Sequence, residues 1–467
     1  MVSRGSGTAG RGGDLFGLVS LHQSLCFFGN FGNLNSIDMY KKIIGAALCW
    51  LCISGLAAAQ TVTSSGLVAA QNVKSSGLAA AQTVKSSGFP ELDRWAEECI
   101  ERRSLSLGYP GNNDIRLQEF YEWYTANNLE AMIINNAGDP FAEGDHTLSS
   151  LDFEREVIEY FAPKYGFDKD DTWGLVTMSG TDGNNHGIYF GVNYLKGLTG
   201  KMPVVYVSDE AHYSNYRLCD LQHLDVRMVA SDEMGRMIPD SLEAVLDVSR
   251  PCLMVYAMGS TLKGAIDDQE ALNAVLARHP EMAVYRHVDA ALFGGYLPFT
   301  EFRDMVDRRK MAFESISVSG HKFFGIDSPC GIFLTTRSIY DGQATFDVPY
   351  LNANMRMINC SRSGIEPLKF WWLIKTVGDE GWTEQARLIM ENTEYLKAEL
   401  GRIGWPCWNN DHSNTVLFRR PSDAIVRKYN LACGVAFGEP VSHVVVMQHV
   451  TQESIDQLIA DLAKENN

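Results

Sequence analysis

From residue 151 onward, short apolar runs alternate with segments whose apolar residues recur at helical spacing. Six runs have the length and composition of buried strands: WGLVTMSG, PVVYVSD, VRMVAS, CLMVYAMGS, YRHVDAALFG and SISVSGHKFFG. Strands separated by helices require crossover connections, which build a mostly parallel sheet with both faces covered. The pattern therefore predicts an α/β domain over residues 151–345.

Helical spacing also marks residues 93–103, 118–128 and 151–166. The folded body begins near Phe89, where repetitive sequence gives way to this spacing.

The first 88 residues have a different character. Residues 39–60 read MYKKIIGAALCWLCISGLAAAQ, with two lysines, an apolar run and then small residues, which is the layout of a secretory signal peptide. A membrane anchor is the rival interpretation, although residues 43–59 are short for a span, and a buried helix is a third. Residues 1–38 would then be an N-terminal extension, and residues 60–88 a linker with an eleven-residue repeat. We expect the mature protein to lack residues 39–59.

The charge of the 467-residue chain changes this picture in one respect. The net charge is −17, and because residues 1–88 carry +4, the remainder carries −21. An acidic body repels phosphate backbones, which argues against nucleic acid as a partner, while a local pocket for one phosphate is still allowed. The ten cysteines are scattered, as in a reducing compartment, which conflicts with an export signal. Localisation therefore stays open.

A lysine in an apolar setting is the first candidate for chemistry. The run SVSGHKFFG places Lys322 directly after a predicted buried strand. Burial is costly for a charged amine, lowers its pKa and makes the neutral amine a nucleophile that can form a Schiff base.

Three further motifs follow predicted strands. SGTDGNNHG, residues 179–187, places small residues at a helix start, where free amides bind a phosphate, or it is a simple capped turn. SDEAHYSNY contains His212, which is either a stacking platform for a flat cofactor or an ordinary loop histidine. HVDAALFGG ends a strand with Asp289, a carboxylate that needs a cationic partner such as a protonated pyridine nitrogen, with Ala290 and Ala291 leaving room for a ring; a turn cap or an arginine pair is the alternative.

Together these four features meet the requirements of pyridoxal phosphate: an amine for the Schiff base, a carboxylate for the ring nitrogen, a stacking side chain and a phosphate site. Each is weak alone, but their order on successive strand ends is specific. We expect pyridoxal phosphate as cofactor, bound through Lys322, and no metal.

From about Leu107 to the C-terminus the sequence resembles the group II pyridoxal-phosphate decarboxylases, nearest to the branch of bacterial histidine decarboxylases and plant serine decarboxylases. The segments that carry the resemblance are NNAGDPF, SGTDGNNHGI, SDEAHYS, GSTLKGAIDD, HVDAALFGGYLPF, SVSGHKFFGIDSPCG, SRSG and VSHVVVMQHVT. The resemblance implies a large domain of the fold-type I pyridoxal-phosphate transferase kind over residues 151–345. It also implies a catalytic loop with a smaller C-terminal α+β domain over 346–467, and an N-terminal segment 89–150 that contributes to the dimer and the substrate pocket.

The resemblance also assigns roles to residues. Lys322 would hold the cofactor, Asp289 would pair with the ring nitrogen and His212 would stack on the ring. The remaining cofactor-binding candidates are those for the phosphate and those beside the ring: Gly180, Thr181, Ser319 and His321 for the phosphate, Ser260 or Thr261 near the ring hydroxyl, and Ala291. Family members usually have glutamate where this chain has Asp182, and residues 142–150, which match poorly, are expected to border the substrate with Asp145 and His146.

Two residues are assigned to the assembly. Family members are homodimers, or dimers of dimers, with shared active sites, and Tyr350 is the candidate that returns a proton to Cα, with His212 in reserve; ordinary packing is the alternative for Tyr350. Arg362 in SRSG suits a phosphate or carboxylate of the partner chain, or else makes a salt bridge within its own chain.

The sequence thus predicts an L-amino-acid α-decarboxylase that releases CO2 and a primary amine. Histidine, giving histamine, is slightly favoured over serine, giving ethanolamine. Two alternatives remain: another enzyme on this scaffold, such as an aminotransferase or a carbon–carbon lyase, and a secreted protein whose decarboxylase fold is vestigial. We expect a small amino-acid substrate, and no stable membrane association of the mature body.

Overall fold

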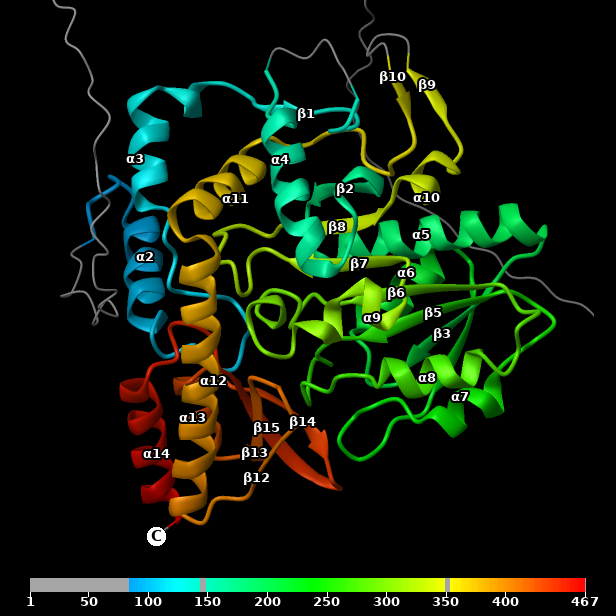
Figure 1. Ribbon diagram of the computed structural model, residues 1–467. Coiled ribbons are helices and arrows are strands. Elements are labelled where there is room, and N and C mark those ends of the chain that lie inside the picture. Colours follow the sequence, from blue (N-terminus) through cyan, green and yellow to red (C-terminus); the bar gives the residue numbers. More distant parts are fainter. Residues whose placement is uncertain (1–83, 143–147, 349–352, 467) are drawn as a thin grey trace, which may run out of the picture. The chain divides into compact units, whose positions relative to one another are not determined.

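The computed structural model describes residues 84–142, 148–348 and 353–466 (Figure 1). The signal-like segment, the repeat, Asp145, His146 and Tyr350 lie outside the described residues. Among the helices of the described part, none is both long and apolar enough to cross a membrane.

A seven-stranded sheet forms the centre of the large domain, in the order β2-β8-β7-β6-β5-β3-β4. Strands β7, β6, β5, β3 and β4 are parallel, while β8 runs antiparallel to both of its neighbours. The strand bounds are β2 Thr172–Thr177, β3 Val204–Ser208, β4 Asp225–Val229, β5 Cys252–Ala257, β6 Val284–Asp289, β7 Ser315–Ser319 and β8 Gly331–Thr336. All six predicted strands are present, and the predicted α/β class is confirmed. The sequence analysis did not single out β8, which returns from β7 through the segment that contains Lys322.

Helices cover both faces of this sheet. Along β3, Val204 and Tyr206 belong to one core cluster and Val205 and Val207 to the other, as expected for a strand that is buried on both sides. The first cluster includes residues of α4, α7 and α8, and the second includes residues of α5, α6 and α10. The helix bounds are α4 Leu151–Phe161, α5 Gly180–Thr199, α6 Tyr213–Leu221, α7 Pro239–Val245, α8 Gln269–Leu276, α9 Arg308–Met311 and α10 Arg337–Asp341. Short 3-10 turns occupy Leu129–Ala131, Ala162–Tyr165, Lys169–Asp171, Leu297–Phe299 and Arg303–Val306.

A stripe of glycines lets α5 lie close to the sheet. A Cβ on Gly183 would lie 2.1 Å from Ser317 Oγ, and one on Gly187 would lie 2.2 Å from the His287 ring. A Cβ on Gly191 would meet the Tyr285 ring at 2.6 Å. Any larger residue at these positions would push the helix away. The stripe therefore sets how near the start of α5 comes to the strand ends.

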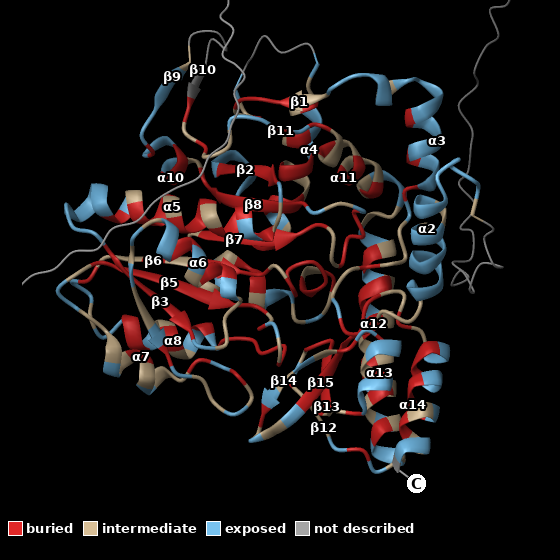
Figure 2. Ribbon diagram, turned by 180° about the vertical axis from the view of Figure 1, so that it is seen from behind, coloured by how far each residue is buried: buried red, intermediate tan, exposed pale blue. Residues whose placement is uncertain are grey.

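Two N-terminal helices precede the large domain: α2 Pro90–Arg102 and α3 Gln118–Ala126. They confirm the helices expected at 93–103 and 118–128, with ends that differ by a few residues. No residue of α2 is buried. Figure 2 shows both helices largely in the colour of exposed residues, whereas the central strands are mostly buried.

The C-terminal part contains two long helices and a second sheet. This antiparallel sheet has the order β12-β13-β15-β14, which fits the expected α+β character of the part. His443 on β15 contacts the carbonyls of Leu262 (2.7 Å) and Gly108 (3.0 Å), joining the sheet to distant parts of the chain. Residues 81–467 form one compact unit, so the boundary expected at 345/346 stays a prediction. The bounds are β1 Asn135–Asn136, β9 Phe346–Val348, β10 Ala353–Met355, β11 Arg362–Ser363, α11 Ile365–Thr376, α12 Gly378–Arg402, β12 Cys407–Asn409, β13 Thr415–Arg419, α13 Asp423–Lys428, β14 Ala432–Ala436, β15 Glu439–Val445 and α14 Gln452–Asn466.

Candidate active site

The candidate residues gather at the carboxyl edge of the parallel strands. Ala257 of β5, Asp289 of β6 and Ser317 of β7 lie in register at this edge. Open α/β sheets bind ligands outside the carboxyl ends of their strands. The geometry therefore brings together motifs that are far apart in the sequence.

Lys322 lies in a tight turn between β7 and β8. The amide of Gly325, whose φ is +71°, donates to the Lys322 carbonyl at 3.2 Å, and the amide of Ile326 donates to the Gly320 carbonyl at 3.2 Å. From outside the turn, the side-chain amides of Asn112 and Gln448 donate to the Phe323 carbonyl. These bonds fix the backbone that carries the amine.

The amine of Lys322 has an altered acidity. Burial lowers its pKa to about 8, and the charge of Asp289 opposes this shift. A much larger fraction of this amine is neutral near neutral pH than for an ordinary lysine, so Lys322 has the property that a Schiff-base nucleophile needs.

Asp289 is buried at the end of β6, with both carboxylate oxygens occupied. Oδ2 accepts a hydrogen bond from Asn215 Nδ2 at 2.8 Å, and Oδ1 accepts one from the Ala291 amide at 3.2 Å. Neither donor is a cation, and the arginine pair considered as an alternative is not what holds this carboxylate. The carboxylate is fixed in orientation and close enough to Lys322 and His212 to influence the pKa of each.

His212 occupies the N-cap position of α6, half-buried. Its Nδ1 lies 2.7 Å from Ser214 Oγ and accepts from the Ser214 amide at 3.3 Å. Burial lowers the pKa of His212; Asp289 opposes the shift and Lys322 adds to it. The imidazole is therefore neutral at neutral pH, and a neutral ring held at a cap is suited to stacking.

The start of α5 meets the strand ends where a phosphate is expected. A Cβ on Gly180 would lie 2.5 Å from Ser319 Oγ and 3.1 Å from Ala291 Cβ, so these three residues are neighbours. Thr181 is exposed in the first turn of α5, whose amides have no acceptor within the helix. The arrangement offers amides, hydroxyls and a helix dipole to an anion.

His321 is adjacent to this corner and carries one constraint. Its Nδ1 lies 3.3 Å from the Cys330 carbonyl, an acceptor, so Nδ1 carries a proton. Burial and the charge of Lys322 lower the pKa of His321. A contact from its Nε2 to a phosphate oxygen would require a second proton on the ring.

The departure at Asp182 is accommodated locally. Its shorter side chain accepts from the Met178 amide at 3.0 Å and from Asn359 Nδ2 at 2.7 Å. Burial raises the pKa of Asp182, but His186 and these donors outweigh burial and the net pKa is lowered. The carboxylate therefore links the start of α5 to the segment before β11.

Ser260 and Thr261 follow β5. Ser260 is buried, and its hydroxyl accepts from the Ala265 amide at 3.0 Å, which closes its own loop. Thr261 is exposed. Their expected place near the ring hydroxyl stays a prediction.

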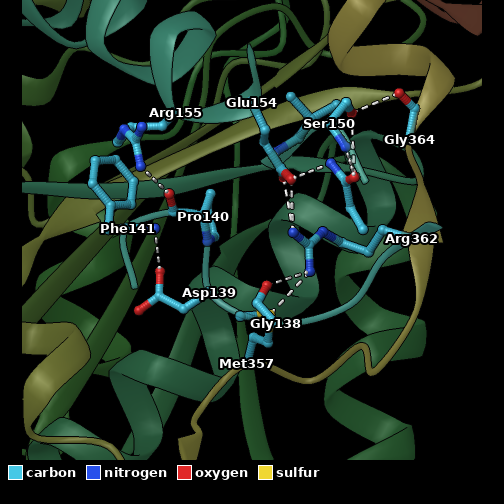
Figure 3. Close-up of polar contacts among 12 residues, drawn as sticks. Gly138, Asp139, Pro140, Phe141, Ser150, Glu154, Arg155, Met357, Arg362 and Gly364 are labelled. Atoms are coloured by element: carbon cyan, nitrogen blue, oxygen red, sulfur yellow. Dashed lines mark hydrogen bonds and ion pairs between the residues drawn. The ribbon is translucent and has the colours of Figure 1, made fainter. Parts of the chain in front are cut away.

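The structure corrects the expectation for Arg362. Its Nη2 contacts both oxygens of Glu154, at 3.0 and 2.8 Å, and Nη1 donates to the Gly138 carbonyl (Figure 3). The two charged side chains are 1% and 0% exposed. A guanidinium enclosed in this way neutralises a buried carboxylate, and cannot also receive a phosphate from another chain. The intrachain salt bridge, the alternative interpretation, is what forms.

Comparison with known proteins identifies the family. Residues 194–405 match the pyridoxal-dependent decarboxylase conserved domain. Histidine decarboxylase of Solanum lycopersicum is 33% identical over 393 residues, covering 81% of this chain and 90% of that protein. Serine decarboxylase 1 of Oryza sativa subsp. japonica is 32% identical over 374 residues, covering 79% and 74%.

The chain belongs to the pyridoxal-dependent decarboxylase family. It is a carboxy-lyase that uses pyridoxal phosphate, and the aminotransferase and carbon–carbon lyase alternatives are not favoured. The fold is shared with L-methionine decarboxylase from Streptomyces sp. 590, at a TM-score of 0.71 and 22% identity, covering 80% of this chain and 94% of that one.

The residues present fit pyridoxal phosphate. Lys322 supplies an amine with a lowered pKa, Asp289 supplies a buried carboxylate, and Gly180 leaves open a corner that a Cβ would fill. Among the described residues, Asn215 Oδ1 is buried beside Asp289 without a hydrogen-bond partner. Amine, carboxylate and phosphate corner all lie at one edge of the sheet.

Two parts of the predicted site lie outside the described residues: Tyr350, and most of the segment 142–150. Conversely, the sequence analysis missed Asn215, which contacts Asp289. Its partner is 74 residues away. The available signal was its place one helical turn after His212, on the same side of α6.

Proposed function

We propose that this protein is an L-amino-acid α-decarboxylase that acts on histidine or serine, with histidine the first choice. The observation that carries the site assignment is Lys322, whose pKa burial lowers to about 8 at the same sheet edge as Asp289. Curated relatives named histidine decarboxylase and serine decarboxylase support this pair of substrates.

Each residue of the chain has one task in this proposal. Pyridoxal phosphate, when bound, supplies an electron sink for the pair left behind as the substrate carboxylate departs as CO2. Lys322 holds the cofactor and yields to the substrate amine. Asp289 keeps a proton at the ring nitrogen, and His212 provides the flat surface on which the ring rests. Gly180, Thr181 and Ser319 bind the phosphate.

A proton must return to Cα after CO2 has left. Tyr350 is the proposed donor and His212 the reserve. With its pKa lowered, a neutral His212 gives up a proton less readily than the resting state of a phenol hydroxyl would allow it to replace; we therefore place Tyr350 first.

A panel of the twenty amino acids tests the substrate proposal. We expect CO2 and an equal amount of primary amine from histidine, or else from serine, without an added keto acid. Amine formation only from some other amino acid would overturn the substrate choice. Transfer of the amino group to an added keto acid, without CO2, would overturn decarboxylation itself.

The proposed assembly is a homodimer with a shared active site. Helix α2 carries an apolar stripe at positions i, i+3, i+7 and i+8, formed by Leu92, Trp95, Cys99 and Ile100. All four are exposed, Trp95 at 64%. A stripe with this spacing needs a partner surface, and a second copy of the chain supplies one in a symmetric pair.

Sedimentation of the full chain tests this interface. Changing Trp95 and Ile100 to serine should shift the protein from dimer to monomer. Glu97→Ser with Glu101→Ser, on the polar side of the same helix, is the control and should leave the dimer intact. An unchanged mass for the first pair would contradict an interface through α2.

A further inference from the structure

Asn215 is a buried polar side chain whose donor and acceptor have different environments. It lies in the first turn of α6 with no exposed surface. Its Nδ2 donates to Asp289 Oδ2 at 2.8 Å. Its Oδ1 finds no hydrogen-bond partner among the described residues.

The chemistry of the pair fixes which end of the amide faces Asp289. A carboxylate only accepts hydrogen bonds, so the amide nitrogen must point toward it and the oxygen away. With the Ala291 amide on the other carboxylate oxygen, the Asp289 side chain is held from two sides. Rotation of the carboxylate would break one of these bonds.

A packing role alone would not require an amide at this position. A buried acceptor without a partner is costly, and leucine has a similar size and no polar atom. The favourable contribution of the amide is therefore its bond to Asp289.

We propose that Asn215 is a positioning residue, which holds the Asp289 carboxylate in the orientation that receives the ring nitrogen of pyridoxal phosphate. The inference rests on the proposed role of Asp289. The groups whose charges interact with Asp289 are Lys322 after β7, His212 at the start of α6 and His287 on β6. None of these substitutes for the donor that Asn215 provides.

The test compares two cofactors on the cofactor-free full chain. One is pyridoxal phosphate, and the other is its carbocyclic analogue, in which a C–H group replaces the ring nitrogen. The ratio of their dissociation constants measures how well the site recognises the nitrogen. It is determined for the parent, Asn215→Leu, Asn215→Asp, Asp289→Asn and a control, with thermal unfolding of each to verify folding.

Asn414→Leu is a matched control. Asn414 is likewise buried, donates through Nδ2 to the Val446 carbonyl at 2.8 Å and has an Oδ1 without a partner among the described residues. Its loss should lower the unfolding temperature and leave the cofactor ratio unchanged.

We expect both Asn215 variants to lose about tenfold in the preference for the ring nitrogen, the size typical of one hydrogen bond to a charged group. Affinity for the carbocyclic analogue should stay within about threefold of the parent, since the analogue makes no use of Asp289. In Asn215→Asp the second carboxylate also repels the first.

An unchanged preference in both variants would overturn the inference, as would an equal loss of affinity for both cofactors. The Asp289→Asn variant separates this failure from that of the proposed function. If that variant keeps the parental preference, Asp289 does not pair with the ring nitrogen, and the assignment of Asp289 falls together with that of Asn215.

Discussion

At the scale of single residues, Lys322 and Asp289 act on each other through charge. Burial lowers the pKa of the lysine to about 8, and the carboxylate limits that shift. The amine is thus protonated in mildly acidic solution and neutral in mildly basic solution. The balance between burial and the neighbouring charge sets the pH at which the nucleophile becomes available.

The rate at which the cofactor-free protein captures pyridoxal phosphate should follow this pKa. Below it, only the neutral fraction reacts, so the rate should rise about tenfold per pH unit up to pH 8 and level off above, as the amine is then neutral. Stopped-flow absorbance between pH 6 and 10 measures the profile. Asp289→Asn should move the midpoint lower, because the opposing charge is gone. A rate that keeps rising through pH 10 would indicate an ordinary lysine.

Asp289→Asn should also reduce kcat by about a hundredfold or more, because a neutral amide no longer stabilises a protonated ring nitrogen as charge develops. Steady-state kinetics with the substrate found in the panel measures the effect. A change confined to KM would show that Asp289 serves uniform binding instead.

The sequence predicted residues of the site that follow strands, and missed or misplaced those defined by distant partners. Lys322, Asp289 and His212 each come after an apolar run, and parallel strands bring such ends together. Asn215 has its partner 74 residues away, and Arg362 has Glu154 208 residues away. No local pattern encodes such pairs, so Arg362 was placed at the cofactor when it neutralises a buried helix carboxylate.

At the scale of elements, the position of α5 is set by its glycines. Gly183 and Gly187 face Ser317 and the His287 ring, with no room for a Cβ. Gly197 lies farther along the same helix, where a Cβ would meet nothing within 4 Å. The two ends of the stripe therefore respond differently to the same substitution.

Gly187→Ala should lower the free energy of unfolding by about 1–3 kcal/mol, because the helix or the His287 ring must move. It should also weaken cofactor binding, since the start of α5 shifts. Gly197→Ala is the control and should raise stability by about 0.5–1 kcal/mol, the usual gain from replacing glycine in a helix. Chemical denaturation compares the two. Equal effects would mean that contact with the sheet does not position α5.

At the scale of the whole molecule, function is proposed to depend on two chains. The sequence predicted the central sheet well, because strands buried on both faces give continuous apolar runs. It did not reveal β8, whose run GIFLTT follows Lys322 without an intervening helix. The need for a partner became visible only in the structure, where the apolar stripe of α2 is exposed.

Mixing two inactive variants tests the shared site. Lys322→Ala and Tyr350→Phe should each be nearly inactive as homodimers. In a mixed dimer one site loses both residues and the other keeps both, so random exchange should restore up to about a quarter of parental activity. No recovery, with subunit exchange confirmed separately, would place Tyr350 in its own chain's site or outside catalysis.

The most direct test of the central claim is to locate the cofactor on the chain. The protein with bound pyridoxal phosphate is treated with a hydride reductant, which makes the Schiff base permanent, and its peptides are analysed by mass spectrometry. The account predicts a phosphopyridoxyl group on Lys322. The modification on another lysine, or on none, would contradict it.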